Sequence, residues 1–107
     1  MGATLQIAAD KDAYTISDRG TYLATDNARG LKILVEGDPS LLNVYHVIEI
    51  PKANGPHVNT AGGKAFADWI VSAPAQRMIG EFGEAKYGQP LFTPDAGKTD
   101  AEIAQAA

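Results

Sequence analysis

The sequence predicts an α/β fold, and two stretches carry this prediction. Residues 14–16 are aromatic or β-branched, as in a half-buried strand, and Ser17 directly after them offers a side-chain oxygen that can cap a helix. That helix is followed by the apolar run Leu31–Val35, which has the composition of a buried strand. A strand, a helix and a second strand in this order are typical of a parallel βαβ unit.

The elements around this unit follow from helical spacing and from helix stop signals. Residues 3–11 predict a short helix that brings Leu5, Ala8 and Ala9 onto one face. The helix that starts after Ser17 is expected to end near residues 27–30, since Gly30 is a favourable stop.

Two further features define the middle of the chain. Residues 36–39 read Glu-Gly-Asp-Pro and predict a turn, because glycine frees φ and proline forces the residue before it out of the helical region. Residues 43–50 alternate strand-forming side chains and predict a longer strand, which Pro51 closes.

Two helices are predicted towards the C-terminus. Asn59 or Thr60 caps the first, which carries an apolar stripe that we expect to lie in the core, and Ser72 caps the second. The stripe of the first helix comprises Ala61, Ala65, Phe66, Trp69 and Ile70. Gly83 ends the second helix, whose apolar stripe comprises Ala75, Met78, Ile79 and Phe82. From Pro94 onward the residues are small and polar, and the last helix-prone stretch, residues 100–107, is expected to be a mobile or loosely docked tail.

Composition excludes several classes of function. Nine Lys and Arg against 13 Asp and Glu give a net charge of -4 without any basic run, so we expect no nucleic-acid partner. The absence of cysteine excludes disulfides, thiol catalysis and cysteine-based zinc sites. No basic segment followed by an apolar run opens the chain, and no stretch reaches the ~20 apolar residues of a membrane helix. We therefore expect neither a signal peptide nor a membrane span in this chain.

The start of the helix after Ser17 has two features that a purely structural helix does not need. Gly20 in the first turn lowers helix propensity, and Arg19 places a positive charge at the positive end of the helix dipole. Both suit a bound anion that accepts from backbone amides and a guanidinium. Spacing alone favours the simpler interpretation of a capped helix, in which Asp18 satisfies the dipole and pairs with Arg19.

No other motif indicates catalysis or metal binding. His46 and His57 lack the spacing of metal ligands, and Glu36 and Asp38 flank a tight turn where solvation explains them better than acid–base chemistry. Phosphate-binding glycine motifs are absent from the sequence. We therefore expect no enzyme, no metal site and no cofactor.

Residues 14–23 resemble the Tyr-Thr-Leu-Thr-Asp-Arg-Gly-Thr-Tyr-Leu segment of tungstate-binding proteins of ABC transporters. This chain departs from the family at three positions. Ser17 stands where the family usually has Thr, so the hydroxyl is kept. Val44 replaces a usual Pro, and Pro74 lies one place later than the corresponding Pro of the family. The resemblance continues in order to about Asp95, through residues 34–39, 43–45 with 47–48, 57–59, 66–70, Ser72 with Gln76, 82–83 and 88–92.

The resemblance implies a C-terminal portion of the two-lobed, type II periplasmic-binding-protein-like fold, incomplete as an isolated chain. Residues 1–42 would belong to the second lobe and residues 43–51 would form a hinge strand. Residues 52–95 would supply the C-terminal helices and last segment of the first lobe, with residues 96–107 as a mobile tail. This also explains why two or three short strands would make a thin sheet for a self-contained domain.

The resemblance further implies a periplasmic or extracytoplasmic substrate-binding component that binds tungstate or molybdate for uptake through a membrane permease. Arg19 is then the leading ligand residue, with Ser17, Thr21 and the backbone of Asp18 and Gly20, and about half of the oxyanion site would lie in this chain. Apolar faces would stay uncovered, so the isolated chain is expected to dimerise or exchange segments. The alternatives are a solute-binding domain for another small anion and a small α/β interaction protein without ligand.

Overall fold

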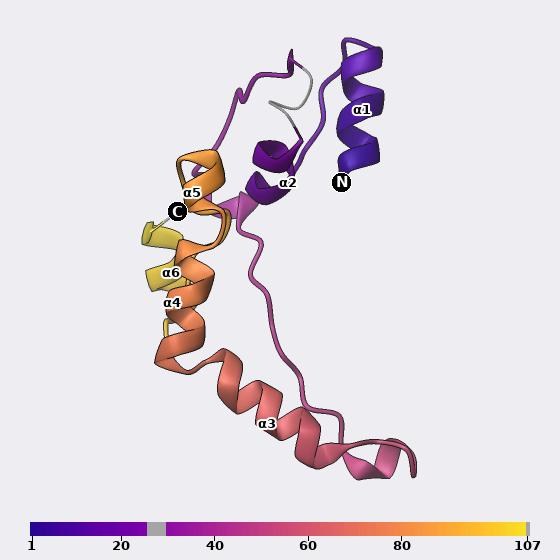
Figure 1. Ribbon diagram of the computed structural model, residues 1–107. Coiled ribbons are helices and arrows are strands. Elements are labelled where there is room, and N and C mark those ends of the chain that lie inside the picture. The colour runs from indigo at the N-terminus through magenta and orange to yellow at the C-terminus, as the bar shows by residue number, and fades with distance from the viewer. Residues whose placement is uncertain (26–29, 107) are drawn as a thin grey trace.

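In a computed structural model that describes residues 1–25 and 30–106, every regular element is helical (Figure 1). The elements are, in chain order, α1 (Gly2–Asp10), α2 (Arg19–Ala24), the 3-10 helices η2 (Pro39–Leu41) and η3 (Lys52–Asn54), α3 (Thr60–Ile70), α4 (Ala73–Glu81), α5 (Glu84–Tyr87) and α6 (Asp100–Ala106).

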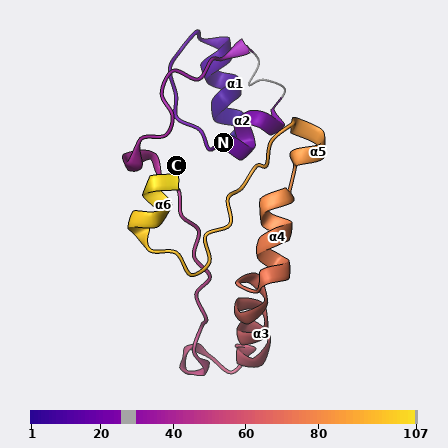
Figure 2. The ribbon, with the colours of Figure 1, turned by 90° about the vertical axis from the view of Figure 1, so that its left-hand side faces the viewer.

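The chain is elongated. Helices α1, α2 and α5 lie at one end, and a stretched segment leads from η2 to η3 at the other end, from which α3 and α4 return (Figures 1 and 2). The molecule measures 49 × 30 × 28 Å, and its radius of gyration is 17.1 Å. A compact domain of this length has a radius of gyration of about 13 Å. The two ends are therefore joined without one shared core.

The three predicted strands, residues 14–16, 31–35 and 43–50, do not form a sheet. No strand occurs among the described residues, so the structure does not confirm the α/β prediction. Their β-forming side chains are mostly exposed, including Ile16, Leu34 and Ile48. A strand exists only through ladder hydrogen bonds to a neighbour, and none of these segments has another as its neighbour here. Residue composition favoured strands, but the pairing partners are not supplied within the described chain.

The predicted helix starts are largely confirmed, because caps are local. Asn59 is the cap of α3, since its Oδ1 accepts from the Gly62 N–H at 2.9 Å. Ser72 is the cap of α4, with its Oγ accepting from the Ala75 N–H at 3.5 Å. Helix α1 buries Leu5 and Ala8 as its spacing predicted.

Other local predictions have mixed outcomes. At residues 36–39, Gly37 has a φ of 76° and Asp38 caps η2, but residues 36–38 form no hydrogen-bonded turn, so the predicted turn is present only where η2 begins. Gly83, at φ 86°, follows the end of α4 as a left-handed residue, but it also begins α5, a single turn that the sequence did not predict. Helix α2 ends at Ala24, and most of its predicted end region lies outside the described residues.

The expectation that the α3 stripe forms a core is wrong in this chain. Trp69 is 47% exposed and Phe66 is 52% exposed, although their rings contact each other at a centroid distance of 5.9 Å. On α4, Ala75 is buried but Met78 is exposed, and Phe82, directly after the helix, is exposed as well. The apolar spacing correctly identified a face that can be buried, but nothing in the described chain covers it.

A short C-terminal segment ties the two ends together. The Leu91 N–H donates to the Phe82 carbonyl at 2.9 Å, and the Phe92 ring lies 6.0 Å from that of Phe82 and 6.3 Å from that of Tyr45. Further on, the Ala96 N–H donates to Gln76 Oε1 at 3.0 Å. These contacts place residues 91–96 along α4 and against the start of α2.

Candidate functional site

The start of α2 is organised by Asp18, not by Ser17. Asp18 has extended backbone angles and its Oδ2 accepts from both the N–H of Thr21, at 2.8 Å, and the Thr21 Oγ1, at 2.9 Å. The Ser17 hydroxyl donates to the Asp18 carbonyl at 3.0 Å. The prediction that Ser17 caps this helix is therefore wrong by one residue. Both residue types cap well, and the carboxylate also suits the positive helix end.

The cap sets the protonation state of Asp18. Partial burial raises the pKa of this carboxyl, but the hydrogen bonds from the Thr21 N–H and hydroxyl outweigh it and leave the pKa below its usual value. Asp18 is consequently ionised at neutral pH. A carboxylate at this position repels an anion, so an anion can approach only on the side of α2 that Asp18 does not face.

Arg19 extends away from this cap to a residue distant in the sequence. Its Nη2 donates to Glu36 Oε2 at 2.9 Å, across 17 residues, and both side chains are about half exposed. The suggested local pair between Arg19 and Asp18 is thus replaced by an ion pair with Glu36. From the sequence, Glu36 is expected only in a solvated turn. No local spacing signal links the two residues, so sequence reasoning could not find this contact.

Gly20 is buried where the C-terminal segment crosses α2. A Cβ added at Gly20 would lie 3.7 Å from the Leu91 carbonyl oxygen and from Phe92 Cζ, and 3.4 Å from Asp18 Oδ2. The glycine therefore permits a close approach of residues 91–92 to the helix. Beside it, the Tyr22 hydroxyl donates to the Leu31 carbonyl at 3.0 Å and anchors the segment that carries Glu36.

The five predicted site residues, Ser17, Asp18, Arg19, Gly20 and Thr21, lie together at this helix start. The two hydroxyls already donate to Asp18, and Asp18 faces inward to its own helix. Arg19 is the one member whose charged group reaches solvent beyond the cap. The arrangement can therefore offer an anion a partly exposed guanidinium, with Glu36 as its present counter-ion.

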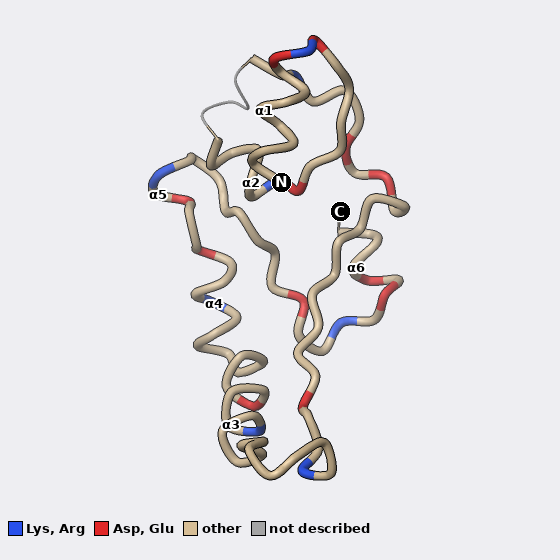
Figure 3. Tube along the Cα trace, turned by 90° about the vertical axis from the view of Figure 1, so that its right-hand side faces the viewer, with Lys and Arg blue, Asp and Glu red and all other residues tan. Residues whose placement is uncertain are grey.

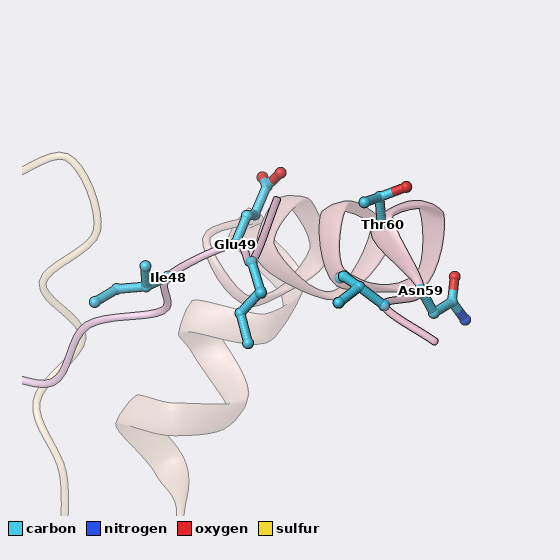
Figure 4. A pocket seen from close by; sticks show the side chains of 7 residues that line it. Ile48, Glu49, Asn59 and Thr60 are labelled. Atoms are coloured by element: carbon cyan, nitrogen blue, oxygen red, sulfur yellow. The ribbon is translucent and has the colours of Figure 1, made fainter. Parts of the chain in front are cut away.

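A groove lies at the opposite end of the molecule from the start of α2. The groove, of about 280 Å³, runs between the extended segment and the start of α3 (Figure 4), and its lining residues are Ile48, Glu49, Ile50, Val58, Asn59, Thr60 and Gly63. In Figure 4 the Glu49 carboxylate and the Thr60 hydroxyl point to the same side. This groove combines apolar walls with one acidic group, which does not suit an anion. The sequence pattern does not predict this groove, because its two walls come from separate elements.

Charges of both signs are scattered along the described chain (Figure 3). Within residues 1–25 and 30–106, no group of three or more His, Cys, Asp or Glu side chains is placed to hold a metal ion. None of the helices in these ranges has both the length and the apolar character that a membrane crossing requires.

Comparison with known proteins defines the class. Residues 1–74 match the PBP superfamily domain, and the chain belongs to this family of periplasmic-binding-protein-like domains. Among its relatives, the tungstate-binding protein TupA of Peptoclostridium acidaminophilum is 50% identical over 92% of this chain and 34% of that protein. TupA of Campylobacter jejuni is 35% identical over 90% of this chain and 36% of that protein. No solved structure matches the chain significantly.

A third relative, from Haloferax volcanii, carries the name of an ABC transporter anion-binding protein and is 37% identical over 98% of this chain and 32% of that protein. The resemblance to tungstate-binding proteins is thus confirmed. The chain spans about a third of the length of these relatives.

Proposed function

We propose that this chain is the C-terminal part of a substrate-binding component of an ABC transporter that takes up tungstate. The observation that carries the proposal is the 50% identity, over 92% of the chain, to a protein named for tungstate binding. The relative named for anion binding in an ABC transporter supports the same role. In this role the chain binds and releases its ligand without chemical change, so it is not an enzyme and needs no cofactor.

Arg19 is the residue that we propose as the main contact of the chain with the oxyanion. Tungstate is a tetrahedral dianion, and a guanidinium donates two parallel hydrogen bonds to such a group. Ser17 and Thr21 can add hydroxyl donors if they turn from Asp18, and the backbone of Asp18 and Gly20 completes the set. Molybdate has the same shape and charge, and we propose it as a second ligand.

We propose the lobes, the location and the partner of the complete protein from the same identity to tungstate-binding proteins. Residues 1–42 would belong to the second lobe of a type II α/β fold, residues 43–51 to a hinge strand and residues 52–95 to the first lobe, followed by a tail over residues 96–107. The segments that lack a sheet here would become strands beside the rest of the protein. The complete protein would work outside the cytoplasm and deliver its ligand to a membrane permease. The isolated chain would cover its apolar faces by self-association.

Calorimetric titration of a full-length protein that carries this sequence tests the proposal. We expect tungstate to bind with high affinity, molybdate to compete and sulfate to bind far more weakly, because it is the smaller anion. Arg19→Ala should weaken tungstate binding by at least about a hundredfold, since a charge-assisted bidentate contact is worth roughly 3 kcal/mol.

Arg77 supplies the matched control, because it is an exposed arginine on α4, remote from the start of α2. Arg77→Ala should leave the affinity unchanged. Unchanged affinity in Arg19→Ala would remove Arg19 from the ligand contacts, whereas an absence of tungstate binding in the unsubstituted protein would refute the function itself.

A further inference from the structure

The segment of residues 43–50 is stretched between the two ends of the molecule with its backbone open (Figures 1 and 2). None of its backbone N–H or C=O groups makes a hydrogen bond to another described residue. The Tyr45 ring packs edge-on against Phe92 near its start, and Pro51 caps η3 at its end. The segment is therefore held at both ends while its polar backbone groups remain available for a ladder.

Apolar side chains surround this open backbone. Ile48 is 81% exposed, and Ile50 is also exposed. Both line the groove at the start of α3, together with Val58 and Gly63. Phe66 lies one helical turn beyond Gly63, and its ring contacts the ring of Trp69. We call the set Ile48, Ile50, Val58, Phe66 and Trp69 the arm surface.

Charge does not oppose contact between two copies of this surface. Glu49 is the single charged residue in the segment 43–50. On α3, Lys64 and Asp68 form an ion pair at 2.9 Å and balance each other. Apart from Glu49 and this balanced pair, the surface is apolar, as is the core of obligate dimer interfaces.

The exposed area of the chain is large enough for a stable dimer. The accessible surface is 8136 Å², whereas a compact monomer of 11.3 kDa exposes about 5,700 Å². The excess is roughly 2,400 Å², and a stable interface needs about 800 Å² from each partner. An interface of that size would therefore use only part of the excess of the whole chain.

We propose that the arm surface is a dimer interface, in which residues 43–50 pair antiparallel with the same segment of a second copy. A two-fold axis through the middle of the segment, near Val47, makes the pairing self-complementary, since each copy offers the same open backbone to the other. The ladder satisfies backbone groups that otherwise remain with water, and the apolar side chains bury one another. This inference concerns the isolated chain and does not depend on its binding an anion.

Light scattering and sedimentation across a range of concentrations test the proposal on the full 107-residue chain. We expect a dimer. Ile48→Lys should raise its dissociation constant by at least about tenfold, because it places a charge in an apolar contact. Ile7, which is exposed on α1 at the other end of the molecule, provides the control, and Ile7→Lys should leave the dissociation constant unchanged. Since Ile48 is largely exposed, its replacement should not unfold the chain, which circular dichroism would confirm.

A single introduced cysteine reports the register, because the chain has no cysteine of its own. Under mild oxidation, Val47→Cys should form an interchain disulfide efficiently, and Ile7→Cys should not. A chain that stays monomeric at all concentrations would overturn the proposal. A dimer whose dissociation constant is unchanged by Ile48→Lys and that does not cross-link through position 47 would also overturn it. Such a dimer would form through another surface or by another exchange of segments.

Discussion

Asp18 fixes the start of α2 through two hydrogen bonds from Thr21, and this makes its contribution to stability measurable. Asp18→Ala should lower the free energy of unfolding by about 1 kcal/mol at pH 7, the usual cost of a lost cap. Ser17→Ala is the natural control, because the Ser17 hydroxyl bonds only to a neighbouring carbonyl. Urea unfolding of both variants measures the difference. A larger loss in Ser17→Ala would show that the cap lies where the sequence first suggested.

The same cap predicts a pH dependence with a defined sign. Since folding lowers the pKa of Asp18, the folded state binds fewer protons, and the stabilisation is present above the unfolded-state pKa near 3.8. It should be lost as the pH falls through the folded-state value. The stability difference between the unsubstituted chain and Asp18→Ala should therefore be full at neutral pH and shrink below about pH 4. A difference that stays constant on acidification would contradict this.

Glu36 would compete with the proposed anion for Arg19, because the ion pair between Arg19 and Glu36 occupies one edge of the guanidinium. Since the pair is exposed, it contributes no more than about 1 kcal/mol. Glu36→Gln in the full-length protein should therefore raise tungstate affinity by up to about fivefold, and added salt should reduce the gain. Glu81→Gln, at an exposed position on α4, controls for net charge. Calorimetry compares the tungstate affinities of the two variants. A loss of affinity in Glu36→Gln would mean that Glu36 holds Arg19 in place for the ligand.

At the scale of the elements, the helices and the expected strands differ in how far the sequence could predict them. Asn59 and Ser72 mark the starts of α3 and α4 because a cap needs only residues within one turn. The segment 43–50 has strand composition but no partner, and a strand requires contacts that local sequence does not specify. The contact of Arg19 with Glu36 is non-local in the same way. Helical spacing predicted the apolar face of α3 that carries Trp69, but it could not reveal that this face stays exposed to solvent.

Gln76 is the side chain that joins α4 to the C-terminal segment. Its Nε2 donates to the Ile70 carbonyl at 2.8 Å, and its Oε1 accepts from the Ala96 N–H. Gln76→Leu keeps the size of the side chain and removes both bonds, so amide exchange at Ala96 and in α6 should accelerate severalfold. Arg77→Leu, one residue along the same helix and exposed, should leave this exchange unchanged. Equal exchange in both variants would mean that α6 is held by other contacts, or is already loose.

The whole molecule is open in a way that a stable isolated domain is not. Only Leu5, Ala8 and Ala75 are buried apolar residues in the described chain, and its radius of gyration of 17.1 Å exceeds the roughly 13 Å of a compact domain. The chain spans about a third of the length of its relatives, and their additional residues offer one way to cover its faces. In their absence, the dimer proposed above would cover part of the same faces.

This openness leads to a prediction about the thermal stability of the chain alone. If a second copy covers the arm surface, association stabilises the folded chain, and each tenfold rise in concentration adds about 1.4 kcal/mol to the stability of the dimer. The unfolding midpoint should then rise by about 3 °C for each tenfold increase in concentration, which differential scanning calorimetry can resolve. In Ile48→Lys the midpoint should be lower and should depend less on concentration, because the weakened dimer dissociates before it unfolds. A midpoint that is independent of concentration in the unsubstituted chain would mean that its few buried residues suffice to fold a monomer.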